Sequence, residues 1–334
     1  MPVLISDQAT SARNAGAYRF GARRRLSGRE ARAKLWLRIR RNWQLYALLF
    51  LPILWLIVFR YAPMYGAQIA FRQYSPAFGI EASPWVGLAN FERFFNSPKF
   101  EPVIVNTLVL SFYSLVAGFP IPILLALSLN QVKARLFRSS VQMITYAPHF
   151  ISTVVIVGML FQFLHPRVGF TAVLANALGM SAPNWMGDPD AFRHIFVWSG
   201  VWQETGFSAI IYLAVLSTVD PALHEAAVVD GASRLQRIRY IDIPSLLPTA
   251  MVLLVLSTGR VLEVAFEKVY LMQSPLNLGV AEVINTYVYK VGLLSPILDF
   301  SYSTAIGLLK GIVGLLLLIT VNHAARRLTA NSVW

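Results

Sequence analysis

The segment HEAAVVDGASRLQRIRYIDIPSLLP, from His224 to Pro248, is dense in acidic, basic and histidine side chains, although only 13% of the chain is charged. It lies between two long apolar runs. The 334 residues are 56% hydrophobic, with a mean hydropathy of +0.56, whereas soluble domains are about 45–50% apolar and about 25% charged. The composition therefore predicts an all-α polytopic membrane protein, in which this charged segment is a connection between two membrane helices.

Membrane spans are predicted from the apolar runs, because a hydrocarbon core of about 30 Å needs about 20 apolar residues in a helix. Six runs meet this length: Leu45–Tyr65, Val103–Leu129, Val141–Leu164, Ile195–Leu216, Leu246–Met272 and Ser301–Ala325. We therefore expect six transmembrane helices.

The orientation follows from the lysines and arginines, which are enriched in cytoplasmic loops. Most of the 29 basic residues fall before Gln44, in the loops that follow the second and fourth runs, and after the last run. This places both termini and the His224–Pro248 segment in the cytoplasm and indicates a multi-pass protein of the bacterial cytoplasmic membrane. The same bias explains the net charge of +13 without nucleic-acid binding.

The basic arm, residues 1–43, precedes a transmembrane domain formed by residues 44–334. In the arm, Trp36, Ile39 and Trp43 recur at spacings of three and four among arginines and lysines. This spacing predicts an amphipathic helix that lies on membrane lipid at the inner leaflet. A simple role in fixing the topology is an equally open interpretation.

Several kinds of chemistry lack the residues that they require. The chain has no cysteine, its five histidines form no HxxxH or HExxH pair, and it contains neither GxSxG nor GxxxxGK[ST]. We therefore expect no metal or cofactor on this chain and no enzymatic activity. If ATP and Mg²⁺ drive its function, other subunits must bind them.

The connection itself, residues 217–245, has helix start and stop signals. Asp220 is a good N-cap, Pro221 suits the first helical turn, and Gly231 is the residue type expected where a helix ends in a sharp turn. A second helical segment, 233–241, then leads back to the membrane. The pattern predicts a protruding element that docks in a groove of a partner, with a merely solvated loop as the alternative.

The spacing of this segment resembles the signature of binding-protein-dependent ABC importer permeases, which is EAA, three residues, Gly, nine residues and Ile-x-Leu-Pro. Here Glu225-Ala226-Ala227 is followed by Gly231 and by Ile241-Asp242-Ile243-Pro244, so that only the leucine differs. Other stretches within residues 45–334 are similar to sugar-importer permeases related to LplB, a subgroup associated with oligosaccharides from acidic polysaccharides such as pectin and alginate. They are RYAPMYGAQIAFRQYSP, WVGLANFERFF, YAPHFISTVV, FEKVYLM and INTYVYKVGL.

The resemblance implies the ABC type I importer permease fold and a set of partners. These are a second permease subunit, two ATPase subunits that bind ATP and Mg²⁺, an extracytoplasmic binding protein and an oligosaccharide substrate. It also implies that the charges of the quoted segment face the ATPase subunits. The residues implied to couple the permease to the ATPases are Glu225, Ala226, Ala227, Asp230, Gly231 and Ala232. Asn277, Glu282 and Asp299, in an outer loop, are candidate contacts with the binding protein.

A substrate path is predicted from charged and aromatic residues in the spans. Arg260, Glu263 and Glu267 would share one face of a helical fifth span, and intramembrane charges usually face a water-filled path or a partner. On the fourth span, Trp198, Trp202, Gln203 and Tyr212 offer stacking surfaces and hydrogen-bonding groups for sugars. A structural Arg260–Glu263 ion pair, a pairing of Lys310 with either acid, and ordinary packing of the aromatic residues remain alternatives.

Two other functional classes remain in view. A secondary transporter or channel for a polar solute would need no ATP, but the docking signature and the lack of a recognisable inverted repeat disfavour it. A membrane-embedded enzyme lacks a recognisable nucleophile, metal or paired-acid motif. Activity that depends on added ATPase subunits distinguishes the importer permease from both.

Overall fold

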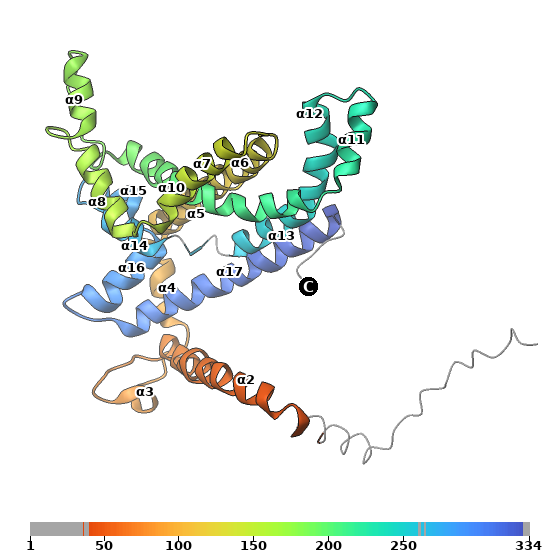
Figure 1. Cartoon of the computed structure of the whole chain (residues 1–334). Helices are drawn as coiled ribbons and strands as arrows, with labels where there is room; N and C mark the ends of the chain where they lie inside the picture. Colours follow the sequence, from red (N-terminus) through yellow and green to blue (C-terminus); the bar gives the residue numbers. More distant parts are fainter. Residues whose placement is uncertain (1–35, 37–39, 260–261, 264, 330–334) are drawn as a thin grey trace, which may run out of the picture. The chain divides into compact units, whose positions relative to one another are not determined.

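The structure is a computed structural model that describes residues 36, 40–259, 262–263 and 265–329 (Figure 1). In this part of the chain the secondary structure is helical apart from two isolated β-bridges, as the composition predicts. The chain divides into two compact units, residues 1–65 and 66–334, which are treated separately below.

The described part of the first unit is the beginning of an apolar helix. It consists of α2 (Trp43–Leu56) and the π-helical turn η1 (Ile57–Tyr61), and it continues into η2 (Ala62–Phe71). No side chain of α2 is buried within the protein, which suits a helix whose surroundings are lipid. The predicted interfacial helix around Trp36 and Ile39 lies almost entirely outside the described residues.

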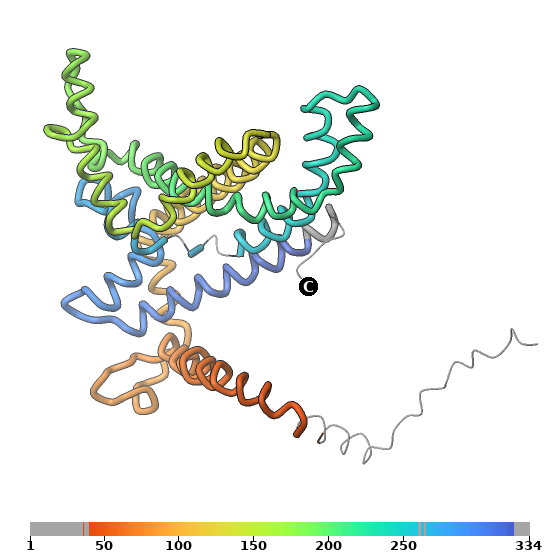
Figure 2. Tube along the Cα trace, viewed as in Figure 1, coloured from red at the N-terminus to blue at the C-terminus, as the bar shows by residue number. Residues whose placement is uncertain are grey.

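The second unit contains the remaining helices, which Figures 1 and 2 trace from orange to blue. In chain order they are α3 (Gly79–Ala82), α4 (Ala89–Phe95), α5 (Phe100–Gly118), α6 (Pro120–Asn130), α7 (Arg135–Tyr146), η3 (Ala147–Phe150), α8 (Thr153–Phe163), α9 (Phe170–Ala177), α10 (Pro189–Ser217), α11 (Pro221–Val229), α12 (Arg234–Arg237), η4 (Ile238–Asp242), α13 (Ile243–Gly259), α14 (Phe266–Met272), α15 (Leu278–Ala281), α16 (Ile284–Tyr289), η5 (Lys290–Leu294) and α17 (Phe300–Thr329).

Four of the described helices are long and apolar enough to cross a membrane: Trp43–Phe71, Phe100–Asn130, Arg234–Gly259 and Phe300–His323. Two bent helix pairs raise the number to six if each pair is one span. One pair is α7 and η3 with α8, bent by 100°, and the other is α10 with α11, bent by 71°. The six predicted runs map onto these six elements.

The third predicted span is not a straight helix, and local chemistry explains why. Pro148 lacks the N–H that a continuing helix needs, and Ile151 and Ser152 adopt extended backbone angles. The Ser152 hydroxyl then accepts a hydrogen bond from the Val155 N–H and starts α8. The break therefore follows from a proline that ends one helix and a serine that caps the next.

The fifth predicted span also differs from the expectation of one helix over Leu246–Met272. Helix α13 ends at Gly259, and α14 begins at Phe266. Glycine weakens a helix, and at this position it also permits a close approach, because a Cβ on Gly259 would lie 2.8 Å from Leu318 Cδ1 of α17. Residues 262, 263 and 265 are not helical, so the predicted span is interrupted between Gly259 and Phe266.

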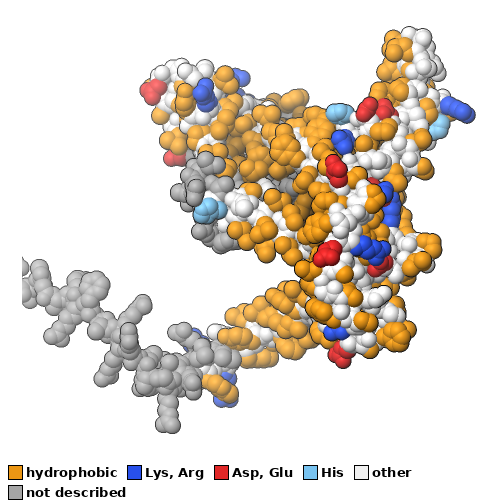
Figure 3. Space-filling model, turned by 180° about the vertical axis from the view of Figure 1, so that it is seen from behind, with side chains coloured by type: hydrophobic (Ala, Val, Ile, Leu, Met, Phe, Trp, Pro, Cys, Tyr) orange, Lys and Arg blue, Asp and Glu red, His pale blue; other side chains and the backbone are white. Residues whose placement is uncertain are grey.

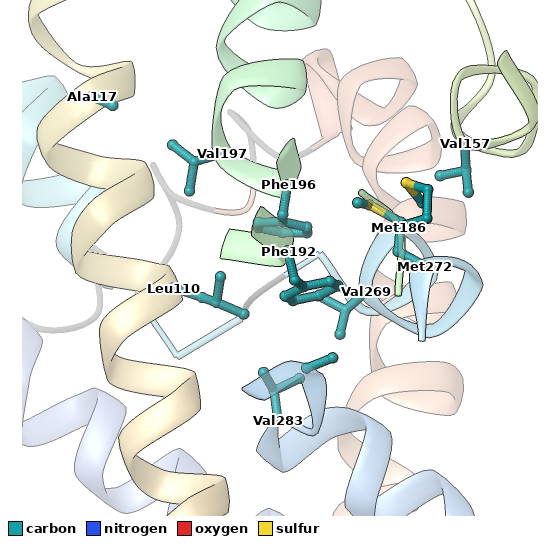
Figure 4. Close-up of a cluster of buried hydrophobic side chains, with 11 residues drawn as sticks. Leu110, Ala117, Val157, Met186, Phe192, Phe196, Val197, Val269, Met272 and Val283 are labelled. Carbon is teal, nitrogen blue, oxygen red and sulfur yellow. The ribbon is translucent and has the colours of Figure 1, made fainter. Parts of the chain in front are cut away.

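The core of the second unit lies where α10 crosses its neighbours. Phe192 and Phe196 of α10 stack on each other, with Leu110 of α5 and Val269 of α14 beside them (Figure 4). A second cluster joins α6, the end of α10 and α13. Many large apolar side chains elsewhere are exposed, and orange side chains cover much of the face in Figure 3. Helices packed through a thin core and apolar on the outside are typical of membrane bundles.

Candidate functional sites

The α11–α12 segment protrudes from the second unit as a helical hairpin (Figures 1 and 2). The Asp220 carboxylate accepts a hydrogen bond from the Ala222 N–H at 2.9 Å, and Pro221 occupies the first helical turn. At the return, Ser233 and Gln236 form a capping box that starts α12. These caps confirm the start signal predicted at Asp220 and fix both helices of the hairpin.

The turn between the two helices is a Schellman motif. The Ala232 N–H bonds to the Ala227 carbonyl at 2.8 Å, and the Gly231 N–H bonds to the Val228 carbonyl at 3.1 Å. Gly231 has a φ of +79°, a conformation that costs little only for glycine. The predicted turn at Gly231 is therefore confirmed, and its geometry requires glycine.

The predicted coupling residues form the outer end of this hairpin. Glu225, Ala226, Asp230 and Gly231 are exposed, and Ala227 and Ala232 are half-buried. No side chain of α11 is buried within the chain. In Figure 3 acidic and basic side chains lie among apolar ones at the hairpin. The outer end of the hairpin is therefore an exposed knob of small, charged and apolar side chains, the apolar ones including Val228 and Val229.

The expectation that all charges of this segment face a partner is wrong for His224 and Asp242. The Asp242 side chain is completely buried; its Oδ2 accepts a hydrogen bond from Gln131 Nε2 at 3.0 Å. His224 Nε2 lies 3.3 Å from Asp242 Oδ1. A buried carboxylate must have polar partners, so these two residues serve the inside of the protein.

A cavity of about 650 Å³ lies among α5, α6, α10, α13 and the segment that leads into α14. Its polar lining consists of serine and threonine hydroxyls with Gln203, Glu204, Glu263 and Lys268. Such a mixture of hydroxyl, amide and charged groups with apolar walls suits a hydrated polar ligand. Within the described residues no cluster of three or more His, Cys, Asp or Glu side chains could hold a metal ion.

Lys268 is the buried cation of this cavity, with only 5% of its surface exposed. Its Nζ donates to the Phe196 carbonyl at 3.1 Å and lies 5.2 Å from the centre of the Phe196 ring. Gly200 leaves room beside the amine, since a Cβ there would lie 3.3 Å from Nζ. One carbonyl satisfies one of the three N–H donors, so the ammonium retains capacity for an anionic ligand.

Glu204 contributes a negatively charged side chain to the lining of the same cavity. Its Oε2 is 2.9 Å from His149 Nδ1, and the His149 ring stacks on Phe207 at 3.9 Å. The carboxylate is half exposed. Glu204 is therefore shared between the cavity and the imidazole, and it does not form a direct ion pair with Lys268.

The predicted path residues fall into two groups. Gln203, Tyr212 and Glu263 line the cavity, although Gln203 also donates to the Ile151 carbonyl and Tyr212 is only 3% exposed. The others in the described part, Trp198, Trp202 and Glu267, are not among its lining residues. The Trp198 indole instead donates to the Tyr113 hydroxyl at 2.9 Å.

The two described acids of the predicted charged face do not share one helix. Glu263 lies between α13 and α14, so it and Glu267 are not on one continuous helix, and Arg260 lies outside the described residues. Lys310 pairs with neither acid, because its Nζ donates to Asn285 Oδ1 at 2.9 Å. Sequence reasoning missed Lys268, which is adjacent to Glu267. The available signal was a lysine within an apolar stretch. Its place in the cavity lining depends on the interruption between α13 and α14, which the sequence pattern did not predict.

Two of the candidate contacts for a binding protein are buried. Asn277 is completely buried and donates to the carbonyls of Met186 and Met272. Glu282 is 5% exposed and pairs with Lys99 at 2.7 Å and with Lys290 at 3.1 Å. These residues hold the outer loops together. Asp299, which pairs with Arg93, is more exposed than either.

Comparison with known proteins gives consistent results. Residues 118–330 match the family model described as binding-protein-dependent transport system inner membrane component. Two relatives come from Bacillus subtilis (strain 168). Protein LplB is 39% identical over 289 residues, which cover 86% of this chain and 90% of LplB. The polygalacturonan/rhamnogalacturonan transport system permease protein YteP is 40% identical over 306 residues, which cover 92% of this chain and 95% of YteP.

Solved structures extend the similarity to three dimensions. A chain of a bacterial ABC transporter involved in the import of the acidic polysaccharide alginate is 41% identical, with a TM-score of 0.82 over 89% of this chain and 99% of that one. A chain from the bacterial alginate ABC transporter in complex with an alginate pentasaccharide-bound periplasmic protein is also 41% identical. Its TM-score is 0.83, over 90% of this chain and all of the matched chain.

Proposed function

The chain belongs to the family of binding-protein-dependent transport system inner membrane components, and from this premise we propose its mechanism and its substrate. It is a sugar-importer permease of the ABC type, a multi-pass protein of the inner membrane. In our proposal, it pairs with a second permease above two ATPase subunits. A periplasmic binding protein delivers an acidic oligosaccharide derived from alginate or pectin.

The α11 knob is the observation that carries the coupling role. It is exposed, capped at both ends and held by a turn that requires glycine. Glu225 and Asp230 point charge outward from it, in the spacing that resembles the permease signature. In the proposed mechanism, closure of the ATPase subunits around ATP moves this knob. The attached helices then switch the permease between inward-open and outward-open states.

The cavity supports the proposed acidic substrate. Lys268 places a buried ammonium group in its wall, near hydroxyl groups such as Ser111 and Thr205 and the Gln203 amide. Hydroxyls and amides exchange hydrogen bonds with sugar hydroxyls, and an ammonium in a poorly hydrated site attracts a carboxylate more strongly than it would in water. Among the similar proteins, one transporter imports the acidic polysaccharide alginate, and YteP belongs to a polygalacturonan/rhamnogalacturonan transport system.

Co-purification tests the proposed coupling. The chain is co-expressed with its second permease and candidate ATPase subunits, as wild type, Glu225→Lys and Gly231→Arg. Charge reversal on the knob and loss of its turn should each abolish recovery of the ATPases or their stimulation by sugar-loaded binding protein. Exposed Glu92, in α4, provides the matched control Glu92→Lys. Full recovery and stimulation in both hairpin variants would refute the proposed docking site.

A further inference from the structure

We propose that His224, Asp242 and Gln131 form an internal latch that transmits movement of α11 to the membrane helices α6 and α13. This inference rests on the proposed function, because it concerns how a docked knob moves the rest of the permease. The three residues come from three elements: His224 from α11, Asp242 from the turn that enters α13, and Gln131 from the end of α6.

The contacts of Asp242 place it at the centre of the latch. Its Oδ2 accepts from Gln131 Nε2 at 3.0 Å, and its Oδ1 lies 3.3 Å from His224 Nε2. The Asp242 side chain is fully buried, whereas that of His224 is 23% exposed. Leu129, two residues before Gln131, and Leu246, four residues after Asp242, belong to the second apolar cluster. A carboxylate in such a site has a strong energetic requirement for both partners.

The His224–Asp242 contact matters because α11 has few other attachments to the rest of the protein. No α11 side chain is buried, and within the described residues the 3.3 Å approach of His224 Nε2 to Asp242 Oδ1 is the polar contact that joins an α11 side chain to another element. The backbone on either side of α11 consists of turns, at 218–220 and 230–233. A force on the knob therefore reaches the bundle through these backbone turns or through the latch.

The positions of the latch residues along the chain also fit a coupling role rather than docking. His224 is adjacent to Glu225, which faces outward, so one helix presents one side to a partner and the other to Asp242. Asp242 is directly before α13, which continues to Gly259 and contributes Leu253 and Ser257 to the lining of the cavity. Displacement of Asp242 thus moves a helix that lines the cavity.

The test uses the assembled transporter in vesicles and measures sugar transported per ATP hydrolysed, together with the amount of ATPase that co-purifies. His224→Phe keeps a planar ring but removes Nε2, and His224→Gln keeps an N–H donor. We expect normal assembly in both, a roughly 2- to 30-fold fall in transport per ATP for the phenylalanine variant, and near-normal coupling for glutamine. His323→Phe, at an exposed histidine of α17, is the matched control and should behave as wild type.

A double mutant makes the test specific to the pair. Since His224→Phe and Asp242→Asn break the same contact, the combined variant should be no worse than the more impaired single variant. Four results would each overturn the latch. They are additive losses of transport per ATP in the double mutant, equal losses in His224→Phe and His224→Gln, wild-type transport per ATP in His224→Phe, and loss of ATPase binding in His224→Phe. A wild-type complex without stimulation by the binding protein would instead overturn the proposed function, and the latch with it.

Discussion

Gly231 offers the sharpest quantitative test of the hairpin. Its φ of +79° lies in the left-handed region, and a Cβ added there would meet no atom within 4 Å. Substitution therefore causes backbone strain without a steric clash. An L-residue in this conformation costs roughly 1–2 kcal/mol, which corresponds to about a 5- to 30-fold loss in the population of the turn. Asparagine tolerates the conformation better than alanine, and β-branched valine tolerates it worst.

The assay is the dependence of binding-protein-stimulated ATP hydrolysis on the concentration of ATPase subunits added to the purified permease pair. The apparent dissociation constant should rise by about 5- to 30-fold for Gly231→Ala, by more for Gly231→Val, and by less for Gly231→Asn. Gly311→Ala is the control, because that glycine lies within α17 with open space around it. Equal affinity across the Gly231 series, or the same loss in the control, would refute the argument from the turn.

Three further predictions follow from buried contacts. Lys268→Met should lower transport of an acidic oligosaccharide by roughly 10-fold or more and leave transport of its carboxyl-reduced neutral analogue unchanged. Transport assays with both compounds check this. Equal losses for the two compounds would contradict a carboxylate-binding role. Gly206→Ala should lower the thermal midpoint of the purified complex, because its Cβ would lie 2.0 Å from the Thr145 carbonyl oxygen and overpacking costs about 1–3 kcal/mol or more; Gly158→Ala, with open space, should not. Glu282→Gln should destabilise the outer loops by about 1 kcal/mol, because the partly exposed Lys99 and Lys290 lose their shared carboxylate, and limited proteolysis should then cleave there faster than in Glu92→Gln.

Local signals in the sequence predicted the helices and the hairpin well. Apolar runs of membrane length correspond to described helices, and Asp220 and Gly231 act as the cap and turn that their residue types indicate. These features depend on neighbours within a few residues. Backbone chemistry at such short range is readable from sequence alone.

Features that depend on distant residues were not predictable in this way. Helix α13 ends at Gly259 and Glu263 is not helical, so Glu263 and Glu267 do not share the expected charged face, and Lys268 of α14 lines the cavity. Asp242 looked like one more charge for a partner, but its burial against Gln131 arises from the packing of α6 on the base of the hairpin. Periodicity assumes a continuous helix, and it fails where tertiary contacts end one.

Site-specific cross-linking tests the central claim, that α11 docks on an ATPase subunit, most directly. The sequence has no cysteine, so a single cysteine at Val229, which is 87% exposed, carries a cross-linker without background. Val173→Cys on α9, also exposed at 64%, is the control. We predict an adduct of the permease with the ATPase subunit from position 229 and none from position 173. No adduct from position 229 in an assembled complex, or equal adducts from both positions, would contradict the account.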